Sequence, residues 1–185
     1  MDTEKWKAQI DRITTEFTNS FGSLSEAQLN WTPAPTTWSI AQNIDHLIII
    51  NKSYYPVIDS VRRGKYKVPI PGRFAFMVNF MGNMILNGVQ PNRKRKIRTF
   101  RIWQPSESNI PADIIDRFCS HQEELKSLIA GSIDLLDKNI IISSPANRNI
   151  VYKLDTAFDI IVTHEQRHFE QSREMLKLMK EQKVY

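Results

Sequence analysis

The sequence predicts an all-α protein in which four long helices form a bundle and a long irregular crossover joins the second helix to the third. Two observations support this prediction. Apolar residues recur at steps of three and four over four separate segments, which is the helical period. Four prolines interrupt the pattern between positions 65 and 109, so no long helix is expected there. We expect one domain, 1–185.

The first helix should begin near Trp6 and end at Gly22, because a glycine often caps a helix C-terminus. Its apolar residues share one helical face: Trp6, Ile10, Ile13, Phe17 and Phe21. A short turn over 25–29 and a proline-rich link over 31–35 should follow.

The second helix should start after Ser39, since Ser39 and Gln42 match a capping box. Its apolar period continues to Ile58, and we expect it to end near Arg63 and Gly64.

The segment 65–109 is interpreted as a long crossover. Within it, 74–86 is apolar enough for a short buried helix, and the alternation of Ile97, Phe100 and Ile102 predicts a short extended segment.

The third helix should begin at Pro111 and end near Gly131. A polar link around Pro145 leads to the last helix, which should run from an N-cap at about Asp155 to about Lys180.

Composition is that of an ordinary globular protein. The 185 residues are 41% hydrophobic and 24% charged, which argues against disorder. No apolar run approaches the roughly 18 residues of a membrane span, and the first residues have no apolar signal core. The one cysteine, Cys119, cannot form an internal disulfide. We therefore expect a cytoplasmic protein without a membrane partner.

Basic charge is concentrated in the crossover. Six positive charges fall within nine residues and account for all of the net charge of +5: Arg93, Lys94, Arg95, Lys96, Arg98 and Arg101. Three interpretations stay open: a solvated loop, a site in which Arg93, Lys94, Arg95 and Lys96 bind an anionic ligand, and a nucleic-acid contact. Nucleic acid is the least favoured, because no stacking aromatics are interleaved with the charges.

The four histidines give the strongest functional signal. His164 and His168 are four apart, so both imidazoles project from one face of the last helix. His46 lies in the second helix, where it can supply a third metal ligand. Three histidine ligands leave positions open for water or substrate, as in catalytic metal sites. A chance pair on a solvated face and a buried, hydrogen-bonded His46 are the structural alternatives.

The segment 164–168 also matches H-E-x-x-H, the zincin protease motif, in which Glu165 would be the general base. The extended motif needs glycine and histidine where Gln171 and Glu174 stand, and only seventeen residues follow His168. A protease is therefore disfavoured.

Two segments resemble signatures of the DinB/YfiT-like superfamily of metal-dependent enzymes. Residues 38–47 read W-S-I-x-x-x-x-x-H-L, which is similar to its second-helix signature, and 164–171 read H-x-x-R-H-x-x-Q, which is similar to its last-helix signature. Residues 29–33 resemble the usual approach to that second helix. The resemblance extends from Trp6 to about Met179.

The resemblance implies an up-down-down-up four-helix bundle and a divalent metal on His46, His164 and His168. Imidazole ligands suit zinc or nickel better than magnesium or calcium. Family members resemble either thiol-dependent transferases or hydrolases. The resemblance therefore implies a metal-dependent enzyme that acts on a small molecule, with a low-molecular-weight thiol as a candidate partner. The alternative is a non-catalytic protein that binds nucleic acid or an anionic ligand through the basic crossover. A homodimer is left open.

Three neighbours are candidates to orient the ligand imidazoles by hydrogen bonds: Asp45, Glu165 and Gln171. Trp31 and Trp38 are interpreted as anchors before the second helix or as walls of a pocket.

Overall fold

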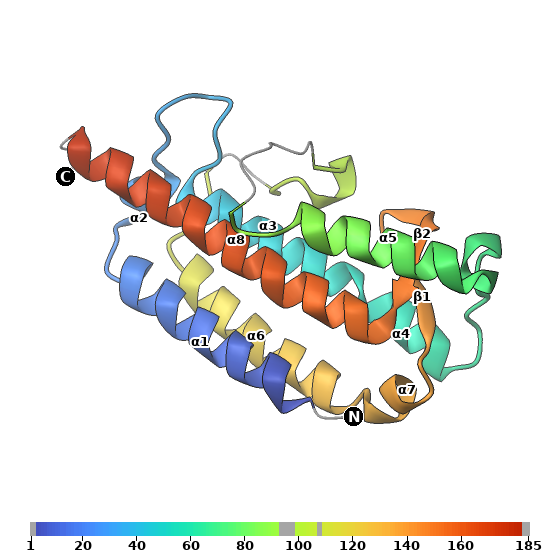
Figure 1. The fold of residues 1–185 in the computed structure, drawn as a ribbon. Coiled ribbons are helices and arrows are strands. Elements are labelled where there is room, and N and C mark those ends of the chain that lie inside the picture. The colour runs from blue at the N-terminus through green and yellow to red at the C-terminus, as the bar shows by residue number, and fades with distance from the viewer. Residues whose placement is uncertain (1–2, 93–98, 107–108, 183–185) are drawn as a thin grey trace.

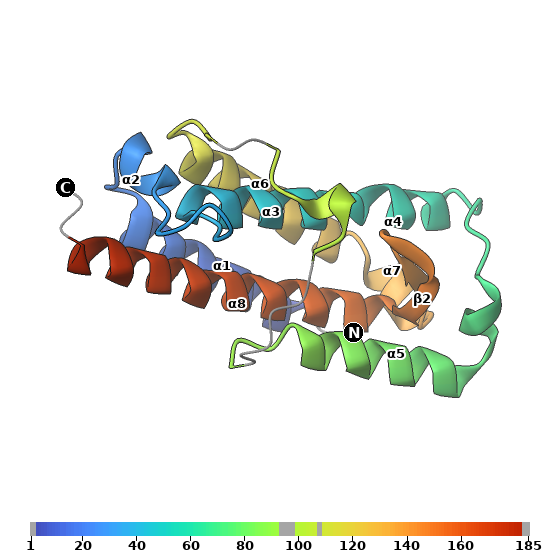
Figure 2. The same ribbon diagram turned by 90° about the horizontal axis from the view of Figure 1, so that it is seen from above.

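The computed structural model describes residues 3–92, 99–106 and 109–182 (Figures 1 and 2). Within these ranges the fold is mostly helical, with one two-stranded sheet. The elements follow one another as α1 (Glu4–Phe21), α2 (Glu26–Asn30), α3 (Ile40–Ser53), α4 (Tyr55–Arg62), η1 (Ile70–Arg73), α5 (Ala75–Gly88), η2 (Arg101–Trp103), α6 (Ile114–Ala130), α7 (Ile133–Asp137), β1 (Ile141–Ser144), β2 (Asn147–Lys153) and α8 (Leu154–Glu181). None of the described helices is long and apolar enough to cross a membrane.

Helices α1, α3, α6 and α8 enclose the core. Both α1 and α3 pack against α6 and also against α8, and Figure 1 shows these four helices side by side. The expected helix starts and stops are largely confirmed. Gly22 caps α1, and Gly131 caps α6. The Ser39–Gln42 capping box is formed, because each side chain bonds to the other residue's backbone N–H at 3.1 Å.

The second helix is divided at Tyr54, where one continuous helix to Arg63 was predicted. Pro56 explains the break. Proline has no N–H for the helical bond to the carbonyl four residues back, and its ring crowds that carbonyl. It is tolerated here because it falls in the first turn of α4.

A β-hairpin replaces the polar link expected around Pro145. Strands β1 and β2 pair antiparallel, with Ile142 opposite Tyr152 and Ser143 opposite Val151. The β-branched runs on either side of the turn favour strands, although no strand was predicted here. Helix α8 follows β2 directly. Lys153 is its N-cap, two residues before the predicted Asp155, whose carboxylate instead accepts a bond from the Thr156 hydroxyl at 3.0 Å.

The crossover differs from the prediction in two ways. Helix α5 forms, but it is not buried, because Phe76 and Phe80 face solvent. The segment around Ile102 is a 3₁₀ turn instead of an extended segment. Ile97 and the predicted anion-binding residues lie outside the described residues: Arg93, Lys94, Arg95 and Lys96.

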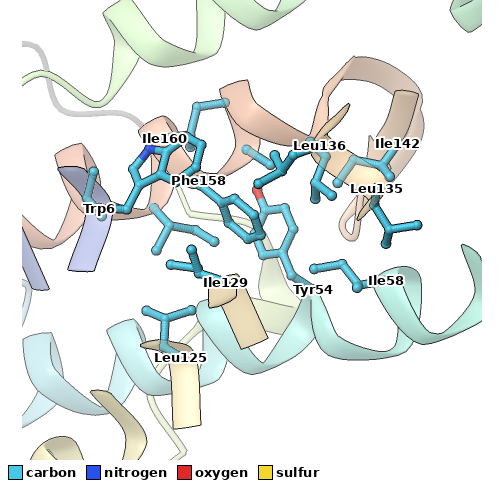
Figure 3. Close-up of a cluster of buried hydrophobic side chains, with 14 of the residues drawn as sticks. Trp6, Tyr54, Ile58, Leu125, Ile129, Leu135, Leu136, Ile142, Phe158 and Ile160 are labelled. Atoms are coloured by element: carbon cyan, nitrogen blue, oxygen red, sulfur yellow. The ribbon is translucent and has the colours of Figure 1, made fainter. Parts of the chain in front are cut away.

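Two clusters of buried apolar side chains hold the helices together. Figure 3 shows part of the first, in which the rings of Trp6 and Phe158 meet edge to face at 5.3 Å. The Trp6 indole N–H also donates to Asp159 at 2.7 Å, which fixes α1 against α8. The second cluster centres on Phe17, which contacts Phe118 and Phe169. Burial of such aromatic side chains is the main stabilising contribution in a domain of this size.

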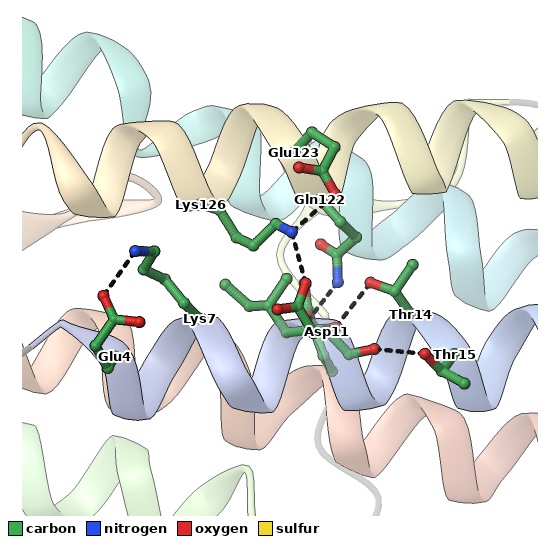
Figure 4. A network of polar contacts seen from close by, with 10 residues as sticks. Glu4, Lys7, Asp11, Thr14, Thr15, Gln122, Glu123 and Lys126 are labelled. Carbon is green, nitrogen blue, oxygen red and sulfur yellow. Dashed lines mark hydrogen bonds and ion pairs between the residues drawn. The ribbon is translucent and has the colours of Figure 1, made fainter.

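Ion pairs line the outer seam between α1 and α6 (Figure 4). Lys126 bonds to Asp11 at 2.5 Å and to Glu123 at 2.8 Å, and Lys7 bonds to Glu4 at 2.7 Å. All three acidic side chains are exposed, so water screens these pairs and each contributes little to stability.

Candidate metal centre

Three histidines from two helices converge at the centre of the fold. His46 comes from α3, and His164 and His168 come from successive turns of α8, which packs against α3. One ring nitrogen from each histidine lies within 4.8 Å of those of the other two. The two segments are more than a hundred residues apart in sequence, so packing of α3 on α8 creates the cluster.

His46 presents Nε2 to the cluster. Its Nδ1 lies 2.5 Å from the backbone oxygen of Trp103. A carbonyl only accepts hydrogen bonds, so Nδ1 carries the proton and Nε2 keeps a free lone pair. That Nε2 is buried and has no hydrogen-bond partner among the described residues. A buried, unpaired acceptor is costly unless a cation or a proton satisfies it.

His168 is held in the same tautomer by Asn43. The Asn43 side-chain N–H donates to the carbonyl of Ser39 at 2.8 Å, so its Oδ1 is the atom that faces His168. The Nδ1–H of His168 then donates to that oxygen at 2.7 Å, and its Nε2 is left as a ligand. Asn43 thus connects the N-cap residue Ser39 of α3 to His168, one of the three clustered histidines.

The Nε2 atoms of His164 and His168 are 3.0 Å apart. Two unprotonated nitrogens at this distance repel each other unless a proton or a metal ion lies between them. Two imidazoles bound to one tetrahedral zinc ion at about 2.0–2.1 Å would place their nitrogens roughly 3.3–3.4 Å apart. The observed distance is that of a hydrogen bond, and a shift of a few tenths of an ångström would convert it to the spacing of two ligands of one ion.

Burial keeps the three histidines in the form that binds metals. It lowers the pKa of His46, and it lowers the pKa values of His164 and His168 well below their usual value. The neighbouring histidines and Arg167 lower the pKa of His168 further. All three imidazoles are therefore neutral at pH 7, and no proton has to leave before an ion binds.

Aromatic rings cover one side of the cluster. The centroid of the Trp38 ring lies 4.8 Å from that of the His46 ring and 6.0 Å from that of the His168 ring, on which Trp38 is stacked. Trp103 contributes its carbonyl to His46, and its indole N–H donates to Ser53 at 3.1 Å. His164 is partly exposed, whereas His46 and His168 are buried.

Asp45 acts on the site through the crossover. Its buried carboxylate accepts bonds from the N–H and the hydroxyl of Ser106, both at 2.8 Å, and Arg117 lies 3.5 Å away. These contacts hold the crossover against α3, next to the place where the Trp103 carbonyl meets His46. Asp45 was expected to orient a ligand imidazole, whereas its hydrogen bonds go to Ser106 of the crossover and Arg117 of α6.

Glu165 points into the protein interior. Its two oxygens accept bonds from Asn51 at 2.7 Å and Gln122 at 3.0 Å, and burial raises its pKa to about 7. Both oxygens are engaged, so Glu165 does not have the free general-base position of the zincin motif. Gln171 is half-buried three residues beyond His168, and its role stays a prediction.

Two residues that position the ligands were not foreseen from the sequence. Trp103 acts through its backbone oxygen, and because every residue has one, the sequence does not indicate this role. Asn43 does have a signal, since it falls one helical turn before the histidine-bearing turn of α3 and four residues after the cap Ser39. Its partner on α8 becomes visible only in the folded chain.

Replacing Asn43 with alanine should weaken zinc binding by about 10–100-fold, because His168 would lose the bond that fixes its tautomer. Asn51→Ala is the matched control, since it removes a second buried asparagine of α3, whose side-chain N–H donates to Glu165 and not to one of the three histidines. Competition with a chromophoric chelator measures both affinities. Equal losses in the two variants would contradict this role of Asn43.

Comparison with known proteins agrees with the geometry. The sequence-family model of the DinB superfamily matches residues 9–172, a span that includes all three histidines. No curated protein and no solved structure matches the chain. Because the matched span covers most of the sequence, the chain belongs to the DinB superfamily.

Proposed function

We propose that this protein is a metal-dependent enzyme in which His46, His164 and His168 hold one divalent ion, zinc or nickel, and that it acts on a small molecule. The observation that carries the proposal is the convergence of three neutral histidines, two of which have Nδ1 engaged by a neighbouring oxygen and Nε2 available to the cluster. We also propose that α1, α3, α6 and α8 form an up-down-down-up bundle around this site.

Three protein ligands suit a catalytic site better than a structural one, because at least one coordination position stays open. A bound zinc or nickel ion supplies a Lewis acid that makes a coordinated water or thiol a nucleophile at neutral pH. The chain's own contribution is to hold the imidazoles in register through Asn43 and Trp103 and to exclude water with the Trp38 ring. We propose that substrate reaches the site on the side of His164, which is the one partly exposed histidine of the three.

The reaction is a thiol-dependent transfer or a hydrolysis. Both need the same activated nucleophile, and the difference is whether a low-molecular-weight thiol or water supplies it. Both oxygens of Glu165 are engaged in the interior, which argues against the base-assisted water attack of zincins. A thiol partner also fits the cytoplasmic location that we propose.

A screen of electrophiles with and without cellular thiols, on zinc- or nickel-loaded protein, tests this function. We expect turnover that is lost on chelation and in His168→Ala. Turnover only with thiol would assign a transferase, and turnover without it a hydrolase. Turnover that survives both chelation and His168→Ala would contradict the proposal.

The alternative, a non-catalytic protein that binds nucleic acid or an anionic ligand through the basic crossover, stays a prediction, because Arg93–Lys96 lie outside the described residues. Tight, steeply salt-dependent binding to DNA that is lost when these four residues are neutralised would favour it.

Removing the metal should lower the melting temperature at neutral pH by several degrees. The ion links α3 to α8, and a ligand at one hundred times its Kd stabilises the folded state by about 2.7 kcal/mol. Thermal unfolding with and without chelator measures the difference, which should shrink on acidification as protons displace the ion. An unchanged melting temperature after confirmed metal removal would mean that the ion does not tie the helices together.

A further inference from the structure

Helix α5 exposes a row of large apolar side chains. Phe76, Phe80 and Met84 are spaced by four residues and are 69%, 64% and 46% exposed. Phe74 and Ile70, just before the helix, are 51% and 71% exposed. Single exposed apolar residues are ordinary, but five close together in sequence form a patch that normally marks a binding surface. We call these five residues the α5 face.

The exposure follows from how α5 is seated. Its inner side packs on β2 and α8, and Figure 2 shows α5 at the outer edge of the molecule beside α8. Gly82 allows the backbone of α5 to lie this close to β2 and α8, because a Cβ at this position would be 3.0 Å from the Thr156 side chain and 3.3 Å from that of Tyr152. Val78 is buried on the same side. Rotation of the helix to bury the phenyl rings would break this contact, so the rings stay outside.

The surroundings of the α5 face are cationic. The helix itself has no charged residue, and residues 60–92 contain five lysines and arginines and no acid. Among the described residues, Lys65, Lys67 and Arg73 are exposed just before α5. Arg148 of the hairpin joins them, because its guanidinium donates to the Lys67 carbonyl at 2.9 Å.

Two acids lie on the adjoining part of α8. Asp159 is paired with Lys5 and also accepts a bond from Trp6, whereas Asp155 accepts bonds from the neutral N–H and hydroxyl of Thr156 and keeps its charge. The α5 face therefore combines apolar side chains with a local excess of positive charge, because Lys65, Lys67, Arg73 and Arg148 outnumber Asp155.

This combination fits an anionic lipid surface better than the other partners. A second copy placed face to face would bring the same cations together, with no carboxylate from 60–106 to pair them. Nucleic acid could use the charges and stack on the exposed phenyl rings, but it would leave Met84 and Ile70 without a partner. A lipid interface takes both, since apolar side chains enter the acyl boundary while lysine and arginine contact anionic headgroups.

We propose that the α5 face binds the surface of an anionic membrane, with α5 lying in the plane of the interface. The earlier expectation of no membrane partner rested on the lack of a spanning segment, and that criterion does not apply to a helix that lies on a surface. The proposal does not depend on the metal centre.

Sedimentation with vesicles tests it. At low ionic strength we expect the full-length protein to sediment with phosphatidylcholine vesicles that contain phosphatidylglycerol and to stay in solution with pure phosphatidylcholine vesicles. Phe76→Asn and Phe80→Asn should each weaken partitioning about tenfold or more, because each removes a large apolar side chain from the acyl boundary. Arg73→Glu should weaken it about fivefold or more.

Matched controls separate the α5 face from general effects. Ile133→Asn changes an exposed apolar residue of α7, and Lys180→Glu makes the same charge change near the far end of α8; both should bind like wild type. The replaced rings are exposed, so melting temperatures should stay close to that of wild type, and Arg73→Glu tests the same face without touching a ring.

Three results would overturn the proposal. The first is no sedimentation with anionic vesicles at low salt. The second is equal binding by wild type, the α5-face variants and Arg73→Glu. The third is a concentration-dependent dimer in sedimentation equilibrium that Phe76→Asn dissociates, without vesicle binding, which would assign the face to a second copy.

Discussion

Replacing His168 with alanine should reduce the bound divalent ion from about one per chain to nearly none. The ion would keep only two protein ligands, and its affinity should fall by more than about 100-fold, or roughly 3 kcal/mol. His164→Ala and His46→Ala should behave alike, because all three nitrogens belong to one cluster. Elemental analysis of zinc- or nickel-loaded, desalted protein measures the stoichiometry.

His121→Ala is the matched control for these variants. It removes the fourth histidine of the chain, which is buried on α6 beside Tyr55 and is not part of the cluster. It should keep about one ion per chain. Circular dichroism confirms that each variant is folded. If His121→Ala loses the ion as fully as His168→Ala does, the assignment of the ligands is wrong.

Acidification should destabilise the metal-free protein, and His121 alone should contribute about 3 kcal/mol of the loss by pH 4. Burial lowers the pKa of His121 to about 4, the nearby Lys52 lowers it further, and Glu124, 3.9 Å away, opposes the shift. A depressed pKa means that the unfolded state binds the proton more readily. The stability from neutral His121 is therefore complete above about pH 6.5 and is lost as the pH falls towards 4.

Urea unfolding of wild type and His121→Leu at several pH values, with chelator present, measures this contribution. Both proteins share the three cluster histidines, whose lowered pKa values also cost stability in acid, so the difference between them isolates His121. The free energy of unfolding of His121→Leu should fall less steeply between pH 6.5 and 4. Parallel curves would show that His121 titrates normally.

Strong periodicity and local capping explain what the sequence predicted well. The apolar face of α1 and the Ser39–Gln42 capping box depend on residues within a few helical turns of one another, so they can be predicted without knowledge of the tertiary structure. The histidine cluster was also within reach, because His164 and His168 share a helix face by spacing alone. The place of His46 beside them required either the packing of α3 on α8 or the family resemblance.

The missed features depend on tertiary context. The apolar runs of β1 and β2 are too short for periodicity to distinguish a strand from a helix, and only their pairing in the fold identifies them as strands. The apolar composition of 74–86 predicted a helix correctly but not its exposure, which depends on Gly82 seating α5 against β2. The Trp103 carbonyl meets His46 near the point where Asp45 binds Ser106, and both contacts join residues that are far apart in sequence.

Nitrogen NMR of the imidazole side chains during zinc titration tests the metal centre most directly. In the metal-free protein, His46 and His168 should show protonated Nδ1 and unprotonated Nε2, as their bonds to Trp103 and Asn43 require. One equivalent of zinc should shift the Nε2 signals of His46 and His168, together with the signals of His164, and leave His121 unchanged. Nε2-protonated tautomers of His46 and His168, or zinc-induced shifts that spare the three cluster histidines, would contradict the site described above.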